Sequence, residues 1–271
     1  MPPPSEQAAH DLLAFYAEAG VDALVGEVPV DRFAAADPAP TTPAPAPAGE
    51  PRRPVSAPAV RPGTPVVAPD EAAMAARAAA RSAATLEELR AILDKFDGCA
   101  LKTTAKQMVF GDGNPQARIM FVGEAPGRDE DIEGVPFVGR SGKLLNLMIK
   151  AIGLARADTY ITNIIPWRPP GNRDPTPQES VICLPFIQRH IELVNPDILV
   201  CLGKPSSQTL LNIKDGILKS RGRWYSYAMP ARQIRAMVTL HPAYLLRQPN
   251  QKRLAWRDFL AIQRELASTQ A

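Results

Sequence analysis

Residues 118–127 read RIMFVGEAPG, an apolar run (118–123) that passes directly into a turn rich in glycine and proline. An unbroken apolar run of this length predicts a strand buried on both faces, which is typical of a parallel sheet. Three further runs have the same texture, at residues 159–165, 197–203 and 236–241. The four runs together predict the strands of one sheet.

Helical patterns alternate with these runs, at residues 142–152, 177–194 and 204–211. Alternation of strands and helices predicts an α/β fold in which helices cover both faces of a parallel sheet. Ligands of such sheets bind beyond the carboxyl ends of the strands. We therefore expect the chemistry just after Val122, Ile161, Leu202 and Leu240.

The chain divides into an N-terminal arm, residues 1–69, and a domain, residues 70–271. In the arm, residues 6–25 predict a short amphipathic helix, and residues 38–69 hold 11 of the 29 prolines. That composition cannot bury a core, so we expect a mostly disordered, semi-rigid linker. The arm is a tether with a docking helix or a binding site for a partner that the sequence does not identify. An alanine-rich helical pattern then runs from Asp70 to about Phe96.

The charge of the chain is unevenly distributed. Residues 1–99 carry 8 Lys and Arg against 14 Asp and Glu, whereas residues 100–271 carry 23 against 14. A basic domain suits a polyanion such as nucleic acid, although charge alone does not decide this. The sequence has no apolar run long enough to cross a membrane and no signal-peptide pattern. Three widely spaced cysteines favour a reducing compartment, so we expect the cytoplasm.

Polar or aromatic side chains follow three of the predicted strands. Glu124 opens the turn after the first strand, Asn163 lies near the end of the second, and His241 ends the fourth. Phe137 follows Pro136 and precedes Val138 and Gly139, and it is either a core residue or a stacking platform for a planar ligand. Asn163 is either a satisfied core amide or a reader of a pyrimidine's pairing edge. A histidine alone is usually structural, but here the three polar groups converge.

Four motifs occur in order: GEAPGRDED (123–131), PFVGRSGKLLN (136–146), YITNIIPWRPPGNRDP (160–175) and HPAYLLR (241–247). Their order resembles that of the family 4 uracil-DNA glycosylases of bacteria and archaea, over roughly residues 90–268. The resemblance implies a three-layer α/β/α sandwich with a central four-stranded parallel sheet. It also implies a monofunctional N-glycosyl hydrolase that flips uracil out of DNA, releases it and leaves an abasic site.

The resemblance assigns roles to individual residues of this sequence. Glu124 and His241 would be catalytic, with Asp129 as the fallback because Ala125 stands where other branches have a catalytic aspartate. Uracil would be contacted by Gly123, Ala125, Phe137 and Asn163. DNA would be contacted by Arg140, Ser141, Lys143 and Arg168, and by a loop that enters the minor groove with Tyr244, Leu245, Leu246 and Arg247. Leu245 and Leu246 would fill the gap left by the extruded base.

The sequence departs from the family at its iron–sulfur site. The family holds a 4Fe–4S cluster with four cysteines, but the matching positions here are Phe96, Cys99, Trp167 and Cys183. Two thiolates cannot replace four, so we predict no metal and no cofactor, with Phe96 and Trp167 filling the space. A second departure is that residues 166–178 contain no histidine, which disfavours the covalent trapping of DNA seen in a related branch.

Three other functions remain open at this stage. The chain could be a non-catalytic binder of uracil-containing DNA on the same fold, or a DNA-binding scaffold whose arm recruits partners. A phosphate-loop enzyme is disfavoured because the glycine-rich turn carries neither of the usual phosphate-binding patterns. For the glycosylase we expect a monomer that works at the nucleoid of a bacterial cytoplasm.

Overall fold

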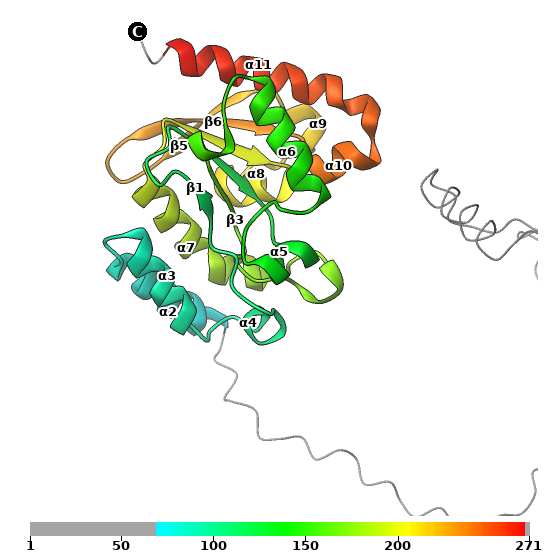
Figure 1. Ribbon diagram of the computed structural model, residues 1–271. Coiled ribbons are helices and arrows are strands. Elements are labelled where there is room, and N and C mark those ends of the chain that lie inside the picture. The colour runs from blue at the N-terminus through cyan, green and yellow to red at the C-terminus, as the bar shows by residue number, and fades with distance from the viewer. Residues whose placement is uncertain (1–68, 269–271) are drawn as a thin grey trace, which may run out of the picture. The chain divides into compact units, whose positions relative to one another are not determined.

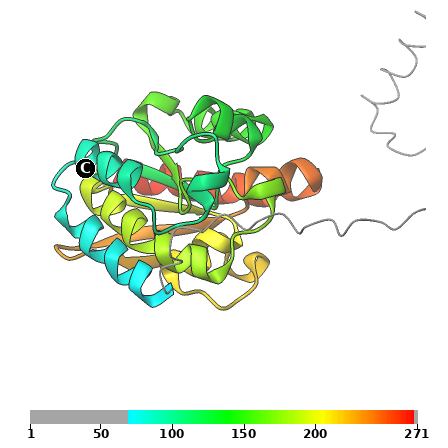
Figure 2. The ribbon, with the colours of Figure 1, turned by 90° about the horizontal axis from the view of Figure 1, so that it is seen from below.

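The computed structural model describes residues 69–268 of the chain. The expectations for residues 6–25 and for nearly all of residues 38–69 lie outside this described part. Within it, a central sheet is covered by helices on both faces, as Figures 1 and 2 show from two directions. The predicted α/β class is therefore confirmed.

The sheet has six strands in the order β1–β3–β2–β4–β6–β5 (Figure 1). The four central strands are parallel and correspond to the four predicted runs. The strand bounds are β1 (Asp112–Gly113), β2 (Ile119–Gly123), β3 (Tyr160–Asn163), β4 (Ile198–Leu202), β5 (Trp224–Ala228) and β6 (Gln233–Thr239). All residues of β2, β3 and β4 are buried, as expected for strands covered on both faces.

Side chains of the central strands alternate between two cores, one on each face of the sheet. On β2, Met120 and Val122 face the core under α2 (Pro69–Ser82), α3 (Leu86–Lys95) and α7 (Pro177–Val194). Ile119 and Phe121 face the other core, under α6 (Arg140–Ala151) and α11 (Lys252–Ser268). The period of two that defines a strand thus produces the three-layer sandwich.

The remaining elements are short and connect the main ones. They are α4 (Leu101–Thr104), α5 (Arg128–Glu133), α8 (Lys204–Leu211), α9 (Ile217–Ser220), α10 (Pro242–Arg247), η1 (Arg156–Asp158), η2 (Pro170–Asn172) and η3 (Pro249–Gln251). No helix of residues 69–268 has both the length and the apolar character that a bilayer crossing requires.

The expected single helix from Asp70 to Phe96 is wrong, because the chain breaks it into α2 and α3. Thr85 caps α3: its hydroxyl accepts the Glu88 N–H at 3.2 Å, and the Glu88 carboxylate accepts the Ala84 N–H at 2.6 Å. The side-chain cap at Thr85 and the bond from Ala84 to Glu88 start a new helix where periodicity alone would continue the old one.

Two strands were not predicted, and both are antiparallel strands at the sheet edges. β1 has only two residues, too few for a recognisable pattern. β5 pairs with β6, which begins at Gln233, before the predicted start at Ala236. The predicted four-stranded parallel sheet is therefore the centre of a six-stranded mixed sheet.

Replacing Thr85 with alanine should lower the free energy of unfolding by about 1 kcal/mol, because the variant loses the cap of α3. Urea unfolding followed by circular dichroism measures this change. Thr103→Ala is the control, since the Thr103 hydroxyl bonds only Ala100 O within its own short helix, and it should change stability by less than about 0.5 kcal/mol. Equal losses in the two variants would contradict the capping role of Thr85.

Candidate active site

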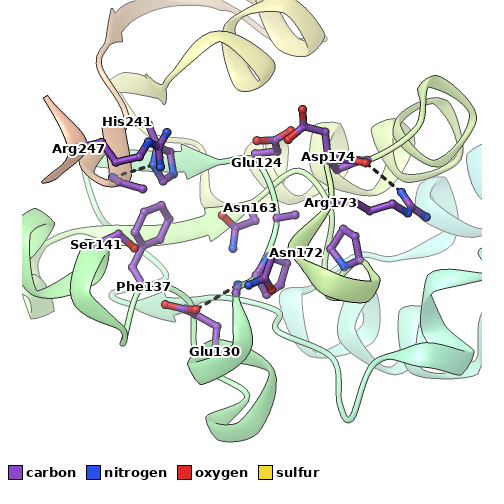
Figure 3. A pocket seen from close by; sticks show the side chains of 16 residues that line it. Glu124, Glu130, Phe137, Ser141, Asn163, Asn172, Arg173, Asp174, His241 and Arg247 are labelled. Atoms are coloured by element: carbon purple, nitrogen blue, oxygen red, sulfur yellow. Dashed lines mark hydrogen bonds between the residues drawn. The ribbon is translucent and has the colours of Figure 1, made fainter. Parts of the chain in front are cut away.

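A pocket of about 310 Å³ opens at the carboxyl edge of the parallel strands (Figure 3). The pocket therefore opens at the edge of the sheet where the sequence analysis places the chemistry. The pocket is lined from the turn after β2, the segment before α6, the end of β3 and the start of α10. Its side chains include Glu124, Phe137, Asn163 and His241.

The carboxyl ends of β2, β3 and β6 supply the pocket with polar side chains. The end of β4 supplies none, but its glycine leaves room for His241. Gly203, which follows β4, has a φ of +93° and does not line the pocket. A Cβ on Gly203 would lie 3.0 Å from the Cβ of His241. The glycine thus lets His241 approach the sheet closely, and no chemistry sits just after Leu202.

Gly123 makes the centre of the pocket possible. A Cβ on Gly123 would lie 2.3 Å from Asn163 Oδ1 and 2.6 Å from the ring of Phe137. Real Cβ atoms do not approach other atoms this closely, so only glycine allows the amide and the ring to meet here. The Phe137 ring also lies 5.6 Å from the His241 ring, between centroids.

Asn163 presents an unpaired amide to the pocket. Its side chain is buried, and Oδ1 has no hydrogen-bond partner among the described residues. Leaving a buried polar atom unpaired costs free energy unless a ligand supplies the partner. The described protein residues therefore leave Asn163 Oδ1 without a partner, and the atom is available to a donor from a ligand.

His241 is held as a neutral donor. It is the N-cap of α10, and its Nδ1 accepts the Ala243 N–H at 3.1 Å, which leaves the ring proton on Nε2. Burial, together with the charge of Arg247, lowers the pKa of His241 to about 4. The ring is thus uncharged at neutral pH.

The pKa of Glu124 is shifted in the opposite direction from that of His241. Burial and the nearby carboxylate of Asp174 raise the pKa of Glu124 to about 7, because both disfavour the charged form. Figure 3 shows the two carboxylates close together at one side of the pocket. A carboxylate with a pKa near neutrality suits proton transfer at physiological pH.

Comparison with known proteins identifies the family of this chain. The model of the uracil DNA glycosylase superfamily matches residues 110–260. The chain belongs to this superfamily. It is 42% identical to the type-4 uracil-DNA glycosylase of Archaeoglobus fulgidus over 168 residues, 60% of this chain and 84% of the relative. It is 42% identical to that of Saccharolobus solfataricus over 179 residues (64% and 83%) and 41% identical to that of Thermotoga maritima over 168 residues (60% and 86%).

Asp129, the fallback catalytic residue, does not line the pocket. It is exposed on the first turn of α5 and lines an adjoining depression with Arg128, Arg140 and Arg247. Because α5 begins at Arg128, the helix turns Asp129 outward, and the neighbouring Glu130 faces the pocket instead. The structure therefore does not bring Asp129 together with Glu124 and His241.

Arg168 was expected to contact DNA, but its guanidinium is engaged inside the protein. It donates to Asn172 Oδ1 at 2.7 Å and lies 3.8 Å from the buried carboxylate of Asp131. The ion pair joins the loop after β3 to helix α5, a proximity that only the folded chain creates. Arg168 thus supports the loop after β3 rather than offering a free cation.

The expected exposed loop after His241 is helix α10, and its leucines face different directions. Leu245 is 1% exposed and packs against Leu240 and Ala255, so its predicted exposure is wrong. Leu246 is 36% exposed, Arg247 is exposed, and Tyr244 is half-buried. Helical geometry turns successive residues by about 100°, which separates the two leucines.

Three of the other expected DNA contacts lie at the pocket or beside it, and the fourth, Lys143, lines neither the pocket nor the adjoining depression. Ser141 and Arg247 line the pocket itself, and Arg140 lines the adjoining depression. Lys143 is exposed on the first turn of α6. Ala125 also lines the pocket, next to Glu124.

Sequence reasoning missed two acidic residues that line the pocket. Asp174 influences Glu124 from the loop after β3, and the buried Glu130 lines the pocket from α5. Both belong to motifs that the sequence displayed. Only their distance from Glu124 and Phe137 in space, which the sequence does not give, reveals their involvement.

The four positions that match the iron–sulfur ligands of the family lie in or against one apolar core. Cys99, Trp167 and Cys183 are buried there, Phe96 packs against it, and the Phe96 ring lies edge-on to Phe186 with centroids 5.0 Å apart. Hydrogen bonding between the two thiols lowers the pKa of Cys99 and raises that of Cys183. Two thiols and two aromatic rings do not fit a cluster that requires four thiolates.

Replacing Asp174 with asparagine should lower the pKa of Glu124 from about 7, because it removes the carboxylate that opposes ionisation. A carbon-13 NMR titration of the glutamate carboxyls measures this pKa, and Glu124→Gln assigns the signal. Asp215→Asn, which removes an exposed carboxylate outside the pocket lining, should leave the titration unchanged. An unchanged midpoint in Asp174→Asn would show that burial alone sets the shift.

Proposed function

We propose that this chain is a DNA-repair enzyme that hydrolyses the N-glycosidic bond of uracil in DNA, releasing uracil and leaving an abasic site. The observation that carries the proposal is the meeting of an aromatic ring, an unpaired amide and a neutral histidine in one pocket. Family membership and the type-4 uracil-DNA glycosylases among its relatives support the same reaction.

Base recognition would rest on Phe137 and Asn163. The ring gives a flipped-out base a face to stack on, and the amide can pair with both N3–H and O4 of uracil. Oδ1 of Asn163, unpaired among the described residues, would accept the N3–H. Cytosine offers an acceptor at N3 and a donor at N4, so it would leave the buried amide mismatched.

The departing uracil would be stabilised by His241. When the bond between C1′ and N1 breaks, its electron pair leaves with the base and places negative charge on the uracil oxygens. Nε2–H of His241 is a preformed donor for O2, because Nδ1 is occupied by Ala243 N–H. A donor that is already oriented stabilises charge as it develops.

The water would be activated by Glu124. Its carboxylate can accept one proton from a water molecule whose oxygen bonds to C1′, while the uracil anion takes up a proton afterwards. With a pKa near 7, Glu124 becomes a competent base as the pH rises through neutrality. The charged carboxylate also stabilises the positive charge that develops on the sugar.

DNA would lie across the mouth of the pocket. Arg140, Lys143 and Arg247 are exposed and suit phosphate contacts, and Ser141 can donate a hydrogen bond. Leu246 is the exposed apolar side chain that could fill the gap in the base stack, and the half-buried Tyr244 lies on the same helix. The buried Leu245 would support this helix from below.

We further propose that the enzyme is a monomer without a cofactor, built from an arm (1–69) and a glycosylase domain (70–271), and that it works on cytoplasmic DNA. The mismatch at the four cluster positions supports the absence of iron. No lysine lines the pocket within the described part of the chain, which supports simple hydrolysis over covalent strand cleavage.

The excision of uracil is the decisive test. Purified protein is incubated with an oligonucleotide containing one uracil, and hot alkali then cuts the strand at abasic sites. We expect scission by the wild type, and a loss of about 100- to 1,000-fold in His241→Ala, because one oriented donor to a developing anion contributes that much. Asn163→Ala should lose at least about 10-fold, because the pairing edge is no longer read.

Asn250→Ala provides a matched control, because Asn250 is an exposed asparagine outside the pocket. It should excise uracil at the wild-type rate. Deletion of residues 1–69 should also preserve excision if the domain carries the activity alone. Binding of uracil-containing DNA without scission would instead identify a non-catalytic binder, and the catalytic roles of Glu124 and His241 would fall.

Iron analysis tests the missing cluster. We expect protein purified without oxygen to contain no stoichiometric iron and no absorption near 400 nm, because only Cys99 and Cys183 remain at the four positions. Cys99→Ala should then leave excision unchanged apart from a small loss of stability. About four iron atoms per chain would refute this part of the proposal.

A further inference from the structure

The backbone of Phe137 adopts a conformation that aromatic residues rarely take. Its φ is +54°, in the left-handed region that glycine occupies easily and other residues do not. The ring nevertheless has to lie beside Asn163 and His241 to form the pocket. Surrounding contacts must therefore hold this conformation, because the residue itself does not favour it.

Arg156 holds one side of the Phe137 backbone. From η1, its Nη2 donates to Pro136 O at 2.6 Å and its Nη1 donates to Phe137 O at 3.2 Å. The guanidinium is itself fixed, because Nε donates to Asp112 at 2.6 Å and Nη1 donates to Asn146 at 2.9 Å. Arg156 does not line the pocket.

Glu130 holds the other side. Its Oε1 accepts the N–H groups of Val138 and Gly139 at 3.1 and 3.0 Å, and its Oε2 accepts the Gly127 N–H at 3.1 Å. The carboxylate is buried, so these bonds are shielded from water. Glu130 thereby joins the turn that carries Glu124 to the segment that carries Phe137.

These contacts exceed what helix capping requires. The bond from Gly127 caps α5, but Val138 and Gly139 lie eight and nine residues away, at the start of α6. The carbonyls of Pro136 and Phe137 are thus held by a cation, and the amides of Val138 and Gly139 are held by an anion. The two peptide units that flank Phe137 have little freedom to turn.

We propose that Arg156 and Glu130 are positioning residues that together keep Phe137 in its left-handed conformation and its ring at the base-stacking place. The inference rests on the proposed function, since it assigns the ring a flipped uracil as its partner. Neither residue is given a chemical step. Arg156 reaches the pocket only through the backbone of residues 136 and 137, so its effect on the base passes through the ring.

A double-variant cycle tests this dependence. Excision in a single turnover and the dissociation constant for a uracil-containing oligonucleotide are measured for the wild type, Arg156→Met, Phe137→Ala and the combined variant. We expect losses of about 30-fold in Phe137→Ala and about 10-fold in Arg156→Met, within the range of base stacking on an aromatic ring. The combined variant should match Phe137→Ala within about 2-fold, because the contact is already gone.

Arg118→Met is the matched control. Arg118 makes a half-exposed ion pair with Asp197 at 2.8 Å, next to β2 but at the end of the sheet opposite the pocket. This variant should leave both measurements unchanged. Multiplied losses in the combined variant, or an Arg156→Met protein that excises at the wild-type rate, would overturn the role of Arg156.

Glu130 is tested by a conservative and a non-conservative variant. Glu130→Gln keeps an oxygen that can accept from Val138 and Gly139, whereas Glu130→Ala keeps none. We expect Glu130→Gln to retain at least about 5-fold more activity than Glu130→Ala. Equal losses in the two variants would overturn its role in holding the Phe137 backbone.

A final measurement separates this inference from the proposed function. The Phe137 ring lies 5.6 Å from His241, so its ring current shifts the proton NMR signals of that histidine. In Arg156→Met these signals should move toward their positions in Phe137→Ala, whether or not the protein excises uracil. Signals that do not move in Arg156→Met would overturn the positioning role, even if the wild type excises uracil. Signals that move, together with a wild type that does not excise uracil, would overturn the proposed function and leave the positioning role intact.

Discussion

The pocket depends on one missing side chain, that of Gly123. Strand β2 ends at this residue, and its neighbour in the sheet, β3, ends at Asn163 opposite it. Any Cβ at Gly123 would collide with the Asn163 amide and with the Phe137 ring. The amide can therefore remain buried and unpaired beside an aromatic face, and this arrangement is only possible where a strand ends without a side chain of its own.

Much of the framework could be predicted because it follows from hydrophobic patterning. The four parallel strands are apolar runs, and the helices at residues 177–194 and 204–211 have the predicted bounds. The failures have local causes. The helix cap at Thr85 interrupts a periodic pattern, and the edge strand β1 is too short to carry a pattern. Segment 241–247 contains a proline and reads as a loop, but the proline begins helix α10.

The site was predictable where it depends on strand ends and unpredictable where it depends on contacts between segments. Glu124, Asn163 and His241 follow strands, so the rule for parallel sheets brings them together. The sequence did not reveal that Asp129 faces outward and Leu245 faces the core, because the phase of a short helix decides which of two neighbours faces inward. Two contacts join residues that only the folded chain brings together. Arg168 forms an ion pair with Asp131, and Glu130 accepts a hydrogen bond from Gly139 at the start of α6.

Helix α10 joins the inner and the outer part of the site in one element. His241 caps its first turn, while Leu246 and Arg247 lie on its last turn. Leu245 packs the same helix into the core. The imidazole and the exposed end of the helix therefore share one anchor, so that a substitution in the core beneath Leu245 would displace both together and neither could be repositioned independently of the other.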